Sequence, residues 1–522
     1  MRKKFMLVFG LAFIIRLISL NQSLWLDEAI TAKVIKQFTL FQISSLFSPT
    51  DFHPPLYYLF MKLWSTLFGV GEIALRLPSV IFSLLTGHAV FLIATRIRNQ
   101  KFGLWAAALY LFNPLAVYYS QEARMYSLVT FLLAFAAYFG FELLRLHENT
   151  HKHRLNGHIY SLIDFIRQKL IRRDSVVSIF DIKEKRILLL FFNLFLILAL
   201  WTFYGSIFFV ASFLLLLLTK KRYKEVGITV VVLSVSFALQ LPLLITQLHN
   251  AQVLQKEAQN WALVLGPATI KNLLLIPIKF AFGRISFYPK FLYYVIAGLW
   301  TSFVFSYVIL GAFKAKRLAF IFSLPLLLGF IFSFFSPLMQ YFRFLYLLPI
   351  MSILIAEGVE HYLSIKKKKG FLHFLHFFKK NQEKKLIHQI RENAIMEILI
   401  GIFLFLSLIY LFFPLHHRED WKSMAQVLPL NKTIYMILPS SDPLLYYRGL
   451  PVKELRNIET EWIFEKEIYI IPYTVPIYGF DYEGKLHNKG CYRKEKRVFH
   501  QVFFERWVCG FISSSCTHIQ QG

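Results

Sequence analysis

The chain has 522 residues, of which 56% are hydrophobic and 17% aromatic, and its mean hydropathy is +0.51. This composition excludes an ordinary soluble protein, because a soluble core of this size could not bury 56 phenylalanines. The net charge of +28 does not indicate nucleic acid, since Lys and Arg gather in short segments between apolar stretches. Such polybasic segments are instead attracted to anionic membrane lipids.

Apolar segments near the length that crosses about 30 Å of hydrocarbon recur through the first four fifths of the chain. Eleven spans are predicted, at 5–20, 75–97, 102–119, 124–144, 187–203, 206–219, 226–246, 291–313, 318–336, 342–358 and 396–414. No small-residue cleavage site follows Leu20, so the first span is predicted to be retained rather than removed as a signal peptide. The fold class is therefore an all-α polytopic membrane protein.

Charge asymmetry predicts a cytoplasmic N-terminus, because every basic cluster then falls on the inner side. This parity requires that 54–70 and 264–283, which carry lysines within aromatic or apolar runs, lie as interfacial helices rather than spans. The outer side then holds the first loop at 21–74, and the basic insertions at 145–186 and 362–395 are cytoplasmic.

The chain changes character after residue 415. Hydrophobicity falls, and strand-like runs at 433–438, 467–472 and 498–504 are separated by turn signals. We predict a transmembrane domain over 1–415 and a small extracytoplasmic α/β domain over 416–522. Three cysteines, at positions 491, 509 and 516, lie in this second region, and their odd number leaves the pairing open.

Two adjacent carboxylates, Asp27 and Glu28, follow the first span. One interpretation is structural, since acidic residues at a helix start stabilise the helix dipole. The functional interpretation is a general base that deprotonates a hydroxyl or amine, which then attacks an activated sugar carbon. Adjacent residues on one helix start point in different directions, so only one can face a shared cavity, and we favour Asp27 for catalysis.

The segment His53-Pro54-Pro55 restricts the backbone and is followed by two tyrosines. It is either a proline-initiated helix start or a site where His53 meets a phosphate or a metal. Tyr57 and Tyr58 offer aromatic faces and hydroxyls to a lipid-linked head group, although tyrosines are also common at membrane interfaces without a further role.

Further ionisable residues stand at the outer ends of spans, where they form either structural ion pairs or the wall of a site. Arg76 lies at the start of the second span, Glu122 and Arg124 lie in a short outer turn, and Arg343 heads a later span, where it could pair with a phosphate leaving group. The outer loop at 247–290 adds cations that the sequence does not rank, namely Lys256, Lys271, Lys279, Arg284 and Lys290.

An ordered set of motifs resembles the bacterial membrane glycosyltransferases of the protein O-mannosyltransferase superfamily, which includes the lipid A aminoarabinose transferase and the rhizobial galacturonosyl transferases. The motifs are Leu26-Asp27-Glu28-Ala29, His53-Pro54-Pro55-Leu56-Tyr57-Tyr58, 74–79, 119–126, 341–349 and 416–422. The resemblance implies the GT-C architecture and sugar transfer from a polyprenyl-phosphate donor on the outer face. The family's catalytic carboxylate falls on Asp27, and His53 falls where relatives carry His or Lys near the donor phosphate.

Our hypothesis is therefore an inverting glycosyltransferase of the inner (plasma) membrane. Asp27, with Glu28 beside it, is the catalytic carboxylate, and the donor group is held by His53, Tyr57, Tyr58, Arg76, Glu122, Arg124 and Arg343. The partners are a polyprenyl-phosphate-linked sugar, an envelope lipid, glycan or protein acceptor, and membrane lipids. No cofactor is predicted, and a divalent cation is left open. One alternative is a transporter or flippase of lipid-linked sugars without bond cleavage. Another is a structural membrane protein whose C-terminal domain binds envelope partners.

Overall fold

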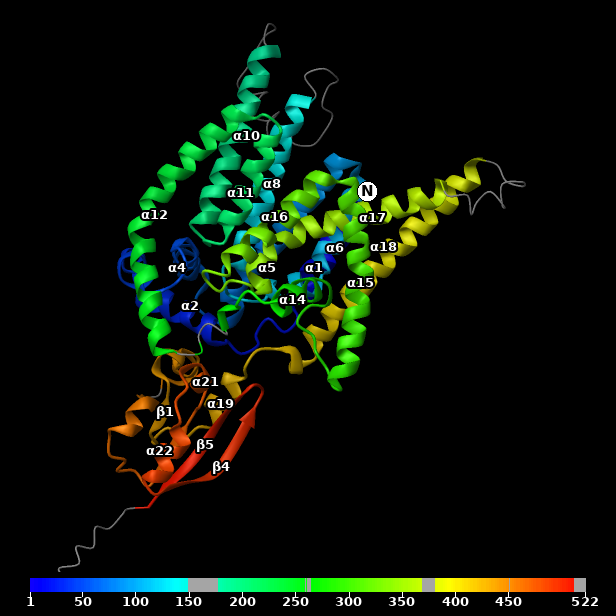
Figure 1. The fold of residues 1–522 in the computed structure, drawn as a ribbon. Helices are drawn as coiled ribbons and strands as arrows, with labels where there is room; N and C mark the ends of the chain where they lie inside the picture. Colours follow the sequence, from blue (N-terminus) through cyan, green and yellow to red (C-terminus); the bar gives the residue numbers. More distant parts are fainter. Residues whose placement is uncertain (149–176, 259, 261–263, 369–380, 450, 511–522) are drawn as a thin grey trace, which may run out of the picture.

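The computed structural model describes the chain except for residues 149–176, 259, 261–263, 369–380, 450 and 511–522. A large helical part is followed by a smaller part that contains strands, and the two meet at one end of the helical part (Figure 1).

The N-terminal half forms helices because its apolar stretches satisfy their backbone polar groups internally, as a membrane requires. The helices are α1 (Arg2–Leu17), α2 (Leu26–Gln37), α3 (Leu40–Gln42), η1 (Ile43–Phe47), η2 (Ser48–Thr50), α4 (Leu56–Phe68), α5 (Glu72–Ile97), α6 (Gln100–Leu111), α7 (Pro114–Ser120), α8 (Tyr126–Glu148), α10 (Val177–Leu200), α11 (Ser206–Thr219) and α12 (Tyr223–Glu257).

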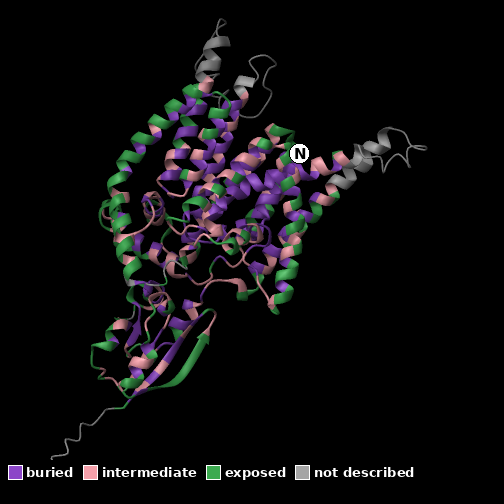
Figure 2. Cartoon of the chain, viewed as in Figure 1, coloured by how far each residue is buried: buried purple, intermediate pink, exposed green. Residues whose placement is uncertain are grey.

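The helical part continues to residue 416. Its remaining helices are α14 (Ile270–Phe282), α15 (Lys290–Lys314), α16 (Lys316–Phe332), η3 (Tyr341–Leu347), α17 (Leu348–Lys368), α18 (Asn381–Phe412) and η4 (Pro414–His416). The segment 341–365 is central, with 89% of its apolar window buried, whereas α12 is peripheral, with 22% buried (Figure 2).

Each of the eleven predicted spans contains a helix, but the count of eleven is not confirmed. Within the described residues, six helices are long and apolar enough to cross a membrane, or seven if α6 and α7, bent by 64° at Asn113, form one span. The helices α1, α11 and α16 have 16, 14 and 17 residues. The two segments predicted as interfacial form the 13-residue helices α4 and α14. At 1.5 Å per residue, 13 residues reach only about 20 Å.

The last hundred residues contain a five-stranded mixed sheet in the order β2-β1-β3-β5-β4. The predicted small α/β fold of this region is confirmed. Its strands are β1 (Ile434–Met436), β2 (Val452–Glu454), β3 (Glu467–Ile470), β4 (Cys491–Phe499) and β5 (Val502–Cys509), and its helices are α19 (Trp421–Val427), η5 (Leu438–Ser440), α20 (Asp442–Arg448), η6 (Leu455–Glu459), α21 (Val475–Tyr478) and α22 (Tyr482–Asn488).

The predicted runs at 433–438 and 467–472 correspond to β1 and β3. The run predicted at 498–504 is not one strand, because it contains the end of β4, the turn at 500–501 and the start of β5. The sequence did not predict β2 or the rest of β4. β4 is a charged edge strand with seven consecutive exposed residues, so it lacks the apolar alternation that indicates a strand. A disulfide joins Cys491 to Cys509 across this hairpin and settles the pairing that the sequence left open. Cys516 lies outside the described residues.

Polar contacts fix the sheet-containing part on the helical part. Lys33 of α2 forms an ion pair with Asp442 of α20 at 2.9 Å, and Lys422 of α19 pairs with Glu72 at the start of α5 at 3.0 Å. The backbone N–H of Leu24 donates to the hydroxyl of Tyr447. The second part thus lies directly against the loop that precedes α2.

Candidate active site

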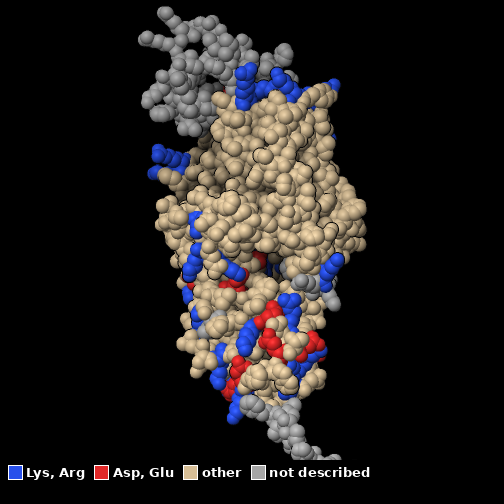
Figure 3. Space-filling view, turned by 90° about the vertical axis from the view of Figure 1, so that its left-hand side faces the viewer, with Lys and Arg blue, Asp and Glu red and all other residues tan. Residues whose placement is uncertain are grey.

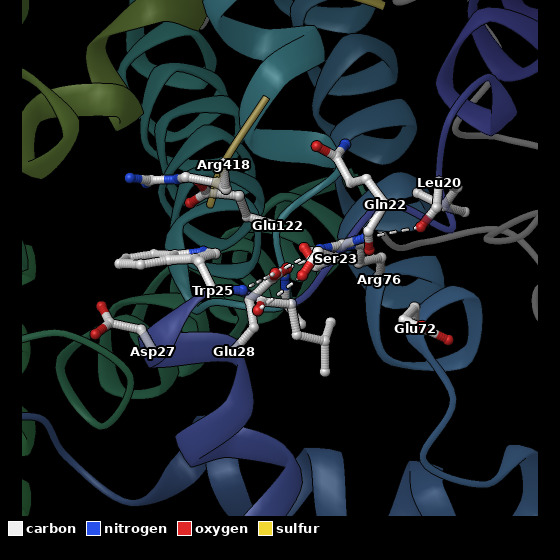
Figure 4. A network of polar contacts seen from close by, with 12 residues as sticks. Leu20, Gln22, Ser23, Trp25, Asp27, Glu28, Glu72, Arg76, Glu122 and Arg418 are labelled. Atoms are coloured by element: carbon white, nitrogen blue, oxygen red, sulfur yellow. Dashed lines mark hydrogen bonds and ion pairs between the residues drawn. The ribbon is translucent and has the colours of Figure 1, made fainter. Parts of the chain in front are cut away.

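A fully buried ion pair forms the base of the site. Glu28 is the third residue of α2, and both of its oxygens bind Arg76 of α5, at 2.8 and 2.5 Å (Figure 4). Each oxygen also accepts a backbone N–H, from Ala123 at 2.7 Å and from Trp25 at 3.4 Å. The three other N–H bonds of Arg76 reach the carbonyls of Leu20, Gln22 and Ser23.

The hydrogen bonds that Glu28 and Arg76 already make limit what else the two side chains can bind. A guanidinium has five N–H donors, and all five of Arg76 are used within the protein, as are the acceptor sites of Glu28. Arg76 is 1% exposed and Glu28 is 0% exposed. The geometry therefore does not suit the phosphate-binding role predicted for Arg76 or the catalytic role predicted for Glu28, because neither side chain has a group left for a substrate. Both instead tie the pre-α2 loop to α5 and to the 121–125 turn.

Asp27 is the available carboxylate. It points to the opposite side of the helix start from Glu28, as expected for adjacent helical residues (Figure 4). Its side chain is 30% exposed, and its Oδ2 lies 3.4 Å from Nη2 of Arg124, which is only 5% exposed. Nη1 of Arg124 donates to the hydroxyl of Tyr58 at 3.1 Å. A partly exposed carboxylate thus lies beside a buried guanidinium, and no backbone or cap contact occupies it.

The negative charge of Asp27 also stabilises the charged form of Arg124. Burial would lower its pKa, but the negative charge of Asp27, followed by the nearby Tyr58 and Tyr126 and then Asp51, raises the pKa well above the ordinary value for arginine. The structure thus places a buried cation directly beside the Asp27 carboxylate.

His53 pairs with a residue that the sequence analysis missed. Its Nδ1 lies 3.5 Å from Oδ1 of Asp51, whose side chain is 16% exposed. Burial would raise the pKa of Asp51, but His53 and Arg124 lower it below the usual value. The signal was available, since Asp51 stands two residues before His53 in a turn that Pro54 and Pro55 rigidify. Asp51 therefore connects the His53 turn to the Asp27–Arg124 pair.

The peripheral helix α12 fixes the His53 turn from outside. Gln247 donates to the carbonyls of Ser48 and His53 at 2.7 and 3.0 Å, and Asn250 donates to the carbonyl of Pro49 at 2.7 Å. These bonds satisfy backbone groups that a tight turn leaves unpaired. The position of His53 thus depends on a helix two hundred residues away in the chain.

Several polar atoms of the residues around Asp27 and Trp25 are buried and have no hydrogen-bond partner within the described residues. They are Asp51 Oδ2, His53 Nδ1, Tyr57 Oη, Arg124 Nε and Glu122 Oε2, of which His53 Nδ1 lies only at ion-pair distance from Asp51. Buried polar groups are rarely left unsatisfied, and such groups are expected at sites that bind water, ions or substrate. This concentration makes the surroundings of Asp27 the candidate binding site.

A second charged group lies on the other side of Trp25. Arg418, from the segment after α18, binds Oε1 of Glu122 at 2.7 Å and stacks 3.8 Å from the Trp25 ring. Arg284, between α14 and α15, lies 4.0 Å from the same oxygen and hydrogen-bonds Tyr118. In Figure 4 the indole lies between Arg418 and Asp27. The sequence includes Arg418 in the motif 416–422 but does not indicate a role for it at the site.

Arg343 lies at the start of the central segment 341–365. Its Nη1 donates to the carbonyl of Pro337 at 3.1 Å, and it contacts no carboxylate among the described residues. The neighbouring Phe342 packs on Tyr126, with ring centroids 5.4 Å apart. Since Asp27, Arg124 and Arg343 all lie near Tyr126, Arg343 belongs to the same neighbourhood.

The predicted residues thus divide into two sets. The structure gathers Asp27, His53, Tyr57, Tyr58, Arg124 and Arg343 near the Asp27–Arg124 pair, with Glu122 on the far side of Trp25. Glu28 and Arg76 form a separate, fully buried pair beside them. No group of three or more His, Cys, Asp or Glu side chains that could hold a metal ion occurs within the described ranges.

Comparison with known proteins bears on this geometry. A model of the dolichyl-phosphate-mannose-protein mannosyltransferase family matches residues 52–157, the stretch that contains His53 and Arg124. No curated protein sequence is significantly similar to the chain.

Solved structures match over nearly the whole length. The chain is similar to ArnT from Cupriavidus metallidurans in the apo state (TM-score 0.52, 12% identity, 96% of this chain and 97% of that chain). It is also similar to ArnT bound to undecaprenyl phosphate (0.51, 11%, 96% and 97%). The archaeal oligosaccharyltransferase AglB from Archaeoglobus fulgidus, in complex with an inhibitory peptide and a dolichol-phosphate, matches at 0.52 and 11% identity, over 96% of this chain and 74% of that chain. The predicted GT-C fold is therefore confirmed.

Proposed function

We propose that this protein is an integral-membrane glycosyltransferase that moves a sugar from a polyprenyl-phosphate donor to an envelope acceptor. The observation that carries the proposal is the Asp27–Arg124 pair, in which a partly exposed carboxylate lies among residues whose buried polar atoms have no hydrogen-bond partner within the described part of the chain. The GT-C fold supports it, because ArnT and AglB were solved with undecaprenyl phosphate and dolichol-phosphate.

In this proposal Asp27 acts as general base. A hydroxyl or amine of the acceptor loses its proton to the Asp27 carboxylate while its oxygen or nitrogen forms a bond to the anomeric carbon. The bond from that carbon to the phosphate oxygen breaks, and the polyprenyl phosphate leaves with the electron pair. A single displacement of this kind inverts the anomeric configuration.

The leaving phosphate gains negative charge and needs cations placed in advance. Arg343 and His53 are assigned this role, since Arg343 contacts no carboxylate among the described residues and the His53 ring lies beside Asp51 in the turn next to the Asp27–Arg124 pair. Tyr57 and Tyr58 are assigned to the donor side, and Arg124 orients Asp27. Glu28 and Arg76 are assigned a positioning role.

The proposed location is the inner (plasma) membrane, with the N-terminus in the cytoplasm and the sheet-containing part outside. Figure 3 shows a broad, nearly uncharged band with Lys and Arg gathered at one end, as expected for a cytoplasmic face. The Cys491–Cys509 disulfide supports an oxidising, extracytoplasmic location for the other end.

Bond cleavage distinguishes this function from a transporter. The purified protein in detergent would be incubated with polyprenyl-phosphate sugars and envelope lipids extracted from its source cells. We expect donor molecules to be converted to free polyprenyl phosphate, measured by liquid chromatography and mass spectrometry. Detergent micelles have no two sides, so a flippase would leave the donor intact, and that result would contradict the proposal.

The donor-phosphate assignment gives a separate prediction. We expect His53→Ala and Arg343→Gln each to weaken undecaprenyl phosphate binding by about tenfold or more, because a hydrogen bond to a charged group contributes about 1.5–3 kcal/mol. Titration followed by native mass spectrometry measures this. The control is Arg317→Gln at the start of α16, on the basic, cytoplasmic side of the proposed topology, which should bind normally. Unchanged binding in both site variants would remove the assignment.

A further inference from the structure

One edge of the sheet is formed by β4, which pairs only with β5. All residues from 492 to 498 are exposed, and Figure 2 shows the strand at the margin of the sheet-containing part. Alternate residues of an antiparallel edge strand direct their N–H and C=O groups away from the neighbouring strand. Among the described residues, no segment other than β5 forms backbone hydrogen bonds with 492–498. β4 therefore presents a row of backbone donors and acceptors that fits a further strand.

The exposed part of β4 is strongly basic. Its one acid, Glu495, is paired with Arg506 of β5 at 3.2 Å. Arg493 is paired at 2.8 Å with Glu505, which is buried and also accepts a hydrogen bond from Tyr482. Both carboxylates are therefore occupied. The cations that remain on this strand are Lys494, Lys496 and Arg497.

These three cations have no carboxylate contact among the described residues. Lys496 stands opposite Glu505 in the strand pairing, but its ammonium lies on the Phe503 ring, 3.8 Å from the centroid. The guanidinium carbon of Arg497 lies 5.9 Å from the centroid of an aromatic ring on its own strand. Lys494 falls at the irregularity in the pairing, where no residue of β5 stands opposite it. The row of backbone groups is thus flanked by positive charge that contacts within the described chain leave unneutralised.

The charges determine which kind of strand fits this edge. Lysines on an edge strand protect a sheet against pairing with its own copies, because a second β4 would place cations opposite cations. The residues after β5 in this sequence, 511–522, include no Asp or Glu and supply no complementary charge. An acidic polysaccharide would neutralise the cations but has no peptide groups to pair with the strand. A peptide strand with acidic side chains matches both the backbone and the charges.

We propose that β4 is a docking site for an acidic, extended segment of another protein, which adds to the sheet as a further strand. The exposed run of β4 spans about 23 Å at about 3.3 Å per residue, so the docked segment has about seven residues. In the proposed topology the sheet lies outside the membrane, so the partner is an envelope protein. The inference is independent of the sugar-transfer reaction, because no residue of 492–498 belongs to the candidate site.

The test uses full-length protein in detergent and a fluorescein-labelled peptide of alternating glutamate and valine, as long as β4, with fluorescence anisotropy as the readout. We expect the peptide to bind the wild type, and more weakly as the salt concentration rises. The triple variant Lys494→Gln/Lys496→Gln/Arg497→Gln should bind at least about tenfold more weakly, because three charge pairs with the peptide are lost. Its Tm should equal that of the wild type, since these side chains are exposed, and this shows that the variant is folded.

The matched control removes the same charge from other positions of the sheet-containing part. Lys432→Gln/Lys453→Gln/Lys466→Gln, at or before β1, β2 and β3, should bind the peptide as the wild type does. A peptide of the same charge with N-methyl groups on every second residue cannot form the backbone hydrogen bonds and should bind at least about tenfold more weakly.

Three results would overturn the inference. One is the absence of peptide binding to the wild type, and another is unchanged binding in the β4 triple variant. The third is equal binding of the N-methylated peptide, or displacement of the peptide by an equal concentration of polygalacturonate, because charge alone would then attract acidic polymers to this edge.

Discussion

Asp27→Asn is expected to lower sugar transfer by about 10²- to 10⁴-fold, the usual contribution of a general base, while the protein stays folded and binds undecaprenyl phosphate. The amide keeps the size of the side chain but cannot take the proton of the acceptor. The side chain is 30% exposed and makes no backbone bond, so its replacement should cost little stability. The measurement is the rate at which free polyprenyl phosphate appears in the detergent assay.

The matched control for Asp27→Asn is Asp442→Asn. Asp442 also pairs with a single cation, Lys33, at 2.9 Å, but it lies at the junction of the two parts and away from the candidate site. This control should retain most of the wild-type rate. Transfer by Asp27→Asn above about a tenth of the wild-type rate would exclude Asp27 as the general base, and the enzyme proposal would then need another carboxylate, with Asp51 as the nearest candidate.

Glu28→Gln is expected to destabilise the protein by about 3–5 kcal/mol, the range observed when one partner of a buried ion pair is removed. The substitution leaves Arg76 charged and 1% exposed, and it weakens the acceptor for the Ala123 N–H. The expected readouts are a lower Tm of the purified protein in detergent and a lower yield of folded protein.

Removal of both partners should not rescue the fold. In many proteins an isolated buried pair can be replaced by apolar residues at little cost. Here Glu28→Leu/Arg76→Leu would strand three carbonyls and two N–H groups that the pair now satisfies, so we expect the double variant to be at least as unstable as the single one.

Glu357→Gln provides the comparison. Glu357 also binds an arginine through both oxygens, Arg98 at 2.9 and 3.0 Å, but Arg98 is 31% exposed, so a smaller loss is expected. A Glu28→Gln protein with wild-type Tm and no transfer activity would restore the direct catalytic role that the sequence suggested for Glu28.

Several features could be predicted from local sequence alone. The apolar segments determine a helical membrane protein, because a buried backbone must satisfy its own polar groups there. Asp27 and Glu28 could be separated before the structure was known, since adjacent helical residues point in different directions. His53 could be singled out because Pro54 and Pro55 fix the turn that holds it.

Tertiary packing decided the rest. The sequence shows that Asp27 and Glu28 point in different directions, but only the approach of Arg76 and the 121–125 turn makes Glu28 a buried support. Arg418 meets Glu122 across 296 residues, and Gln247 meets His53 across 194. Residues so far apart are brought together by the packing of whole helices, so the spacing of residues in one sequence does not encode these contacts. The sequence thus determined the membrane class and separated Asp27 from Glu28, whereas the fold decided that the buried contacts of Arg76 and the 121–125 turn saturate Glu28 and not Asp27.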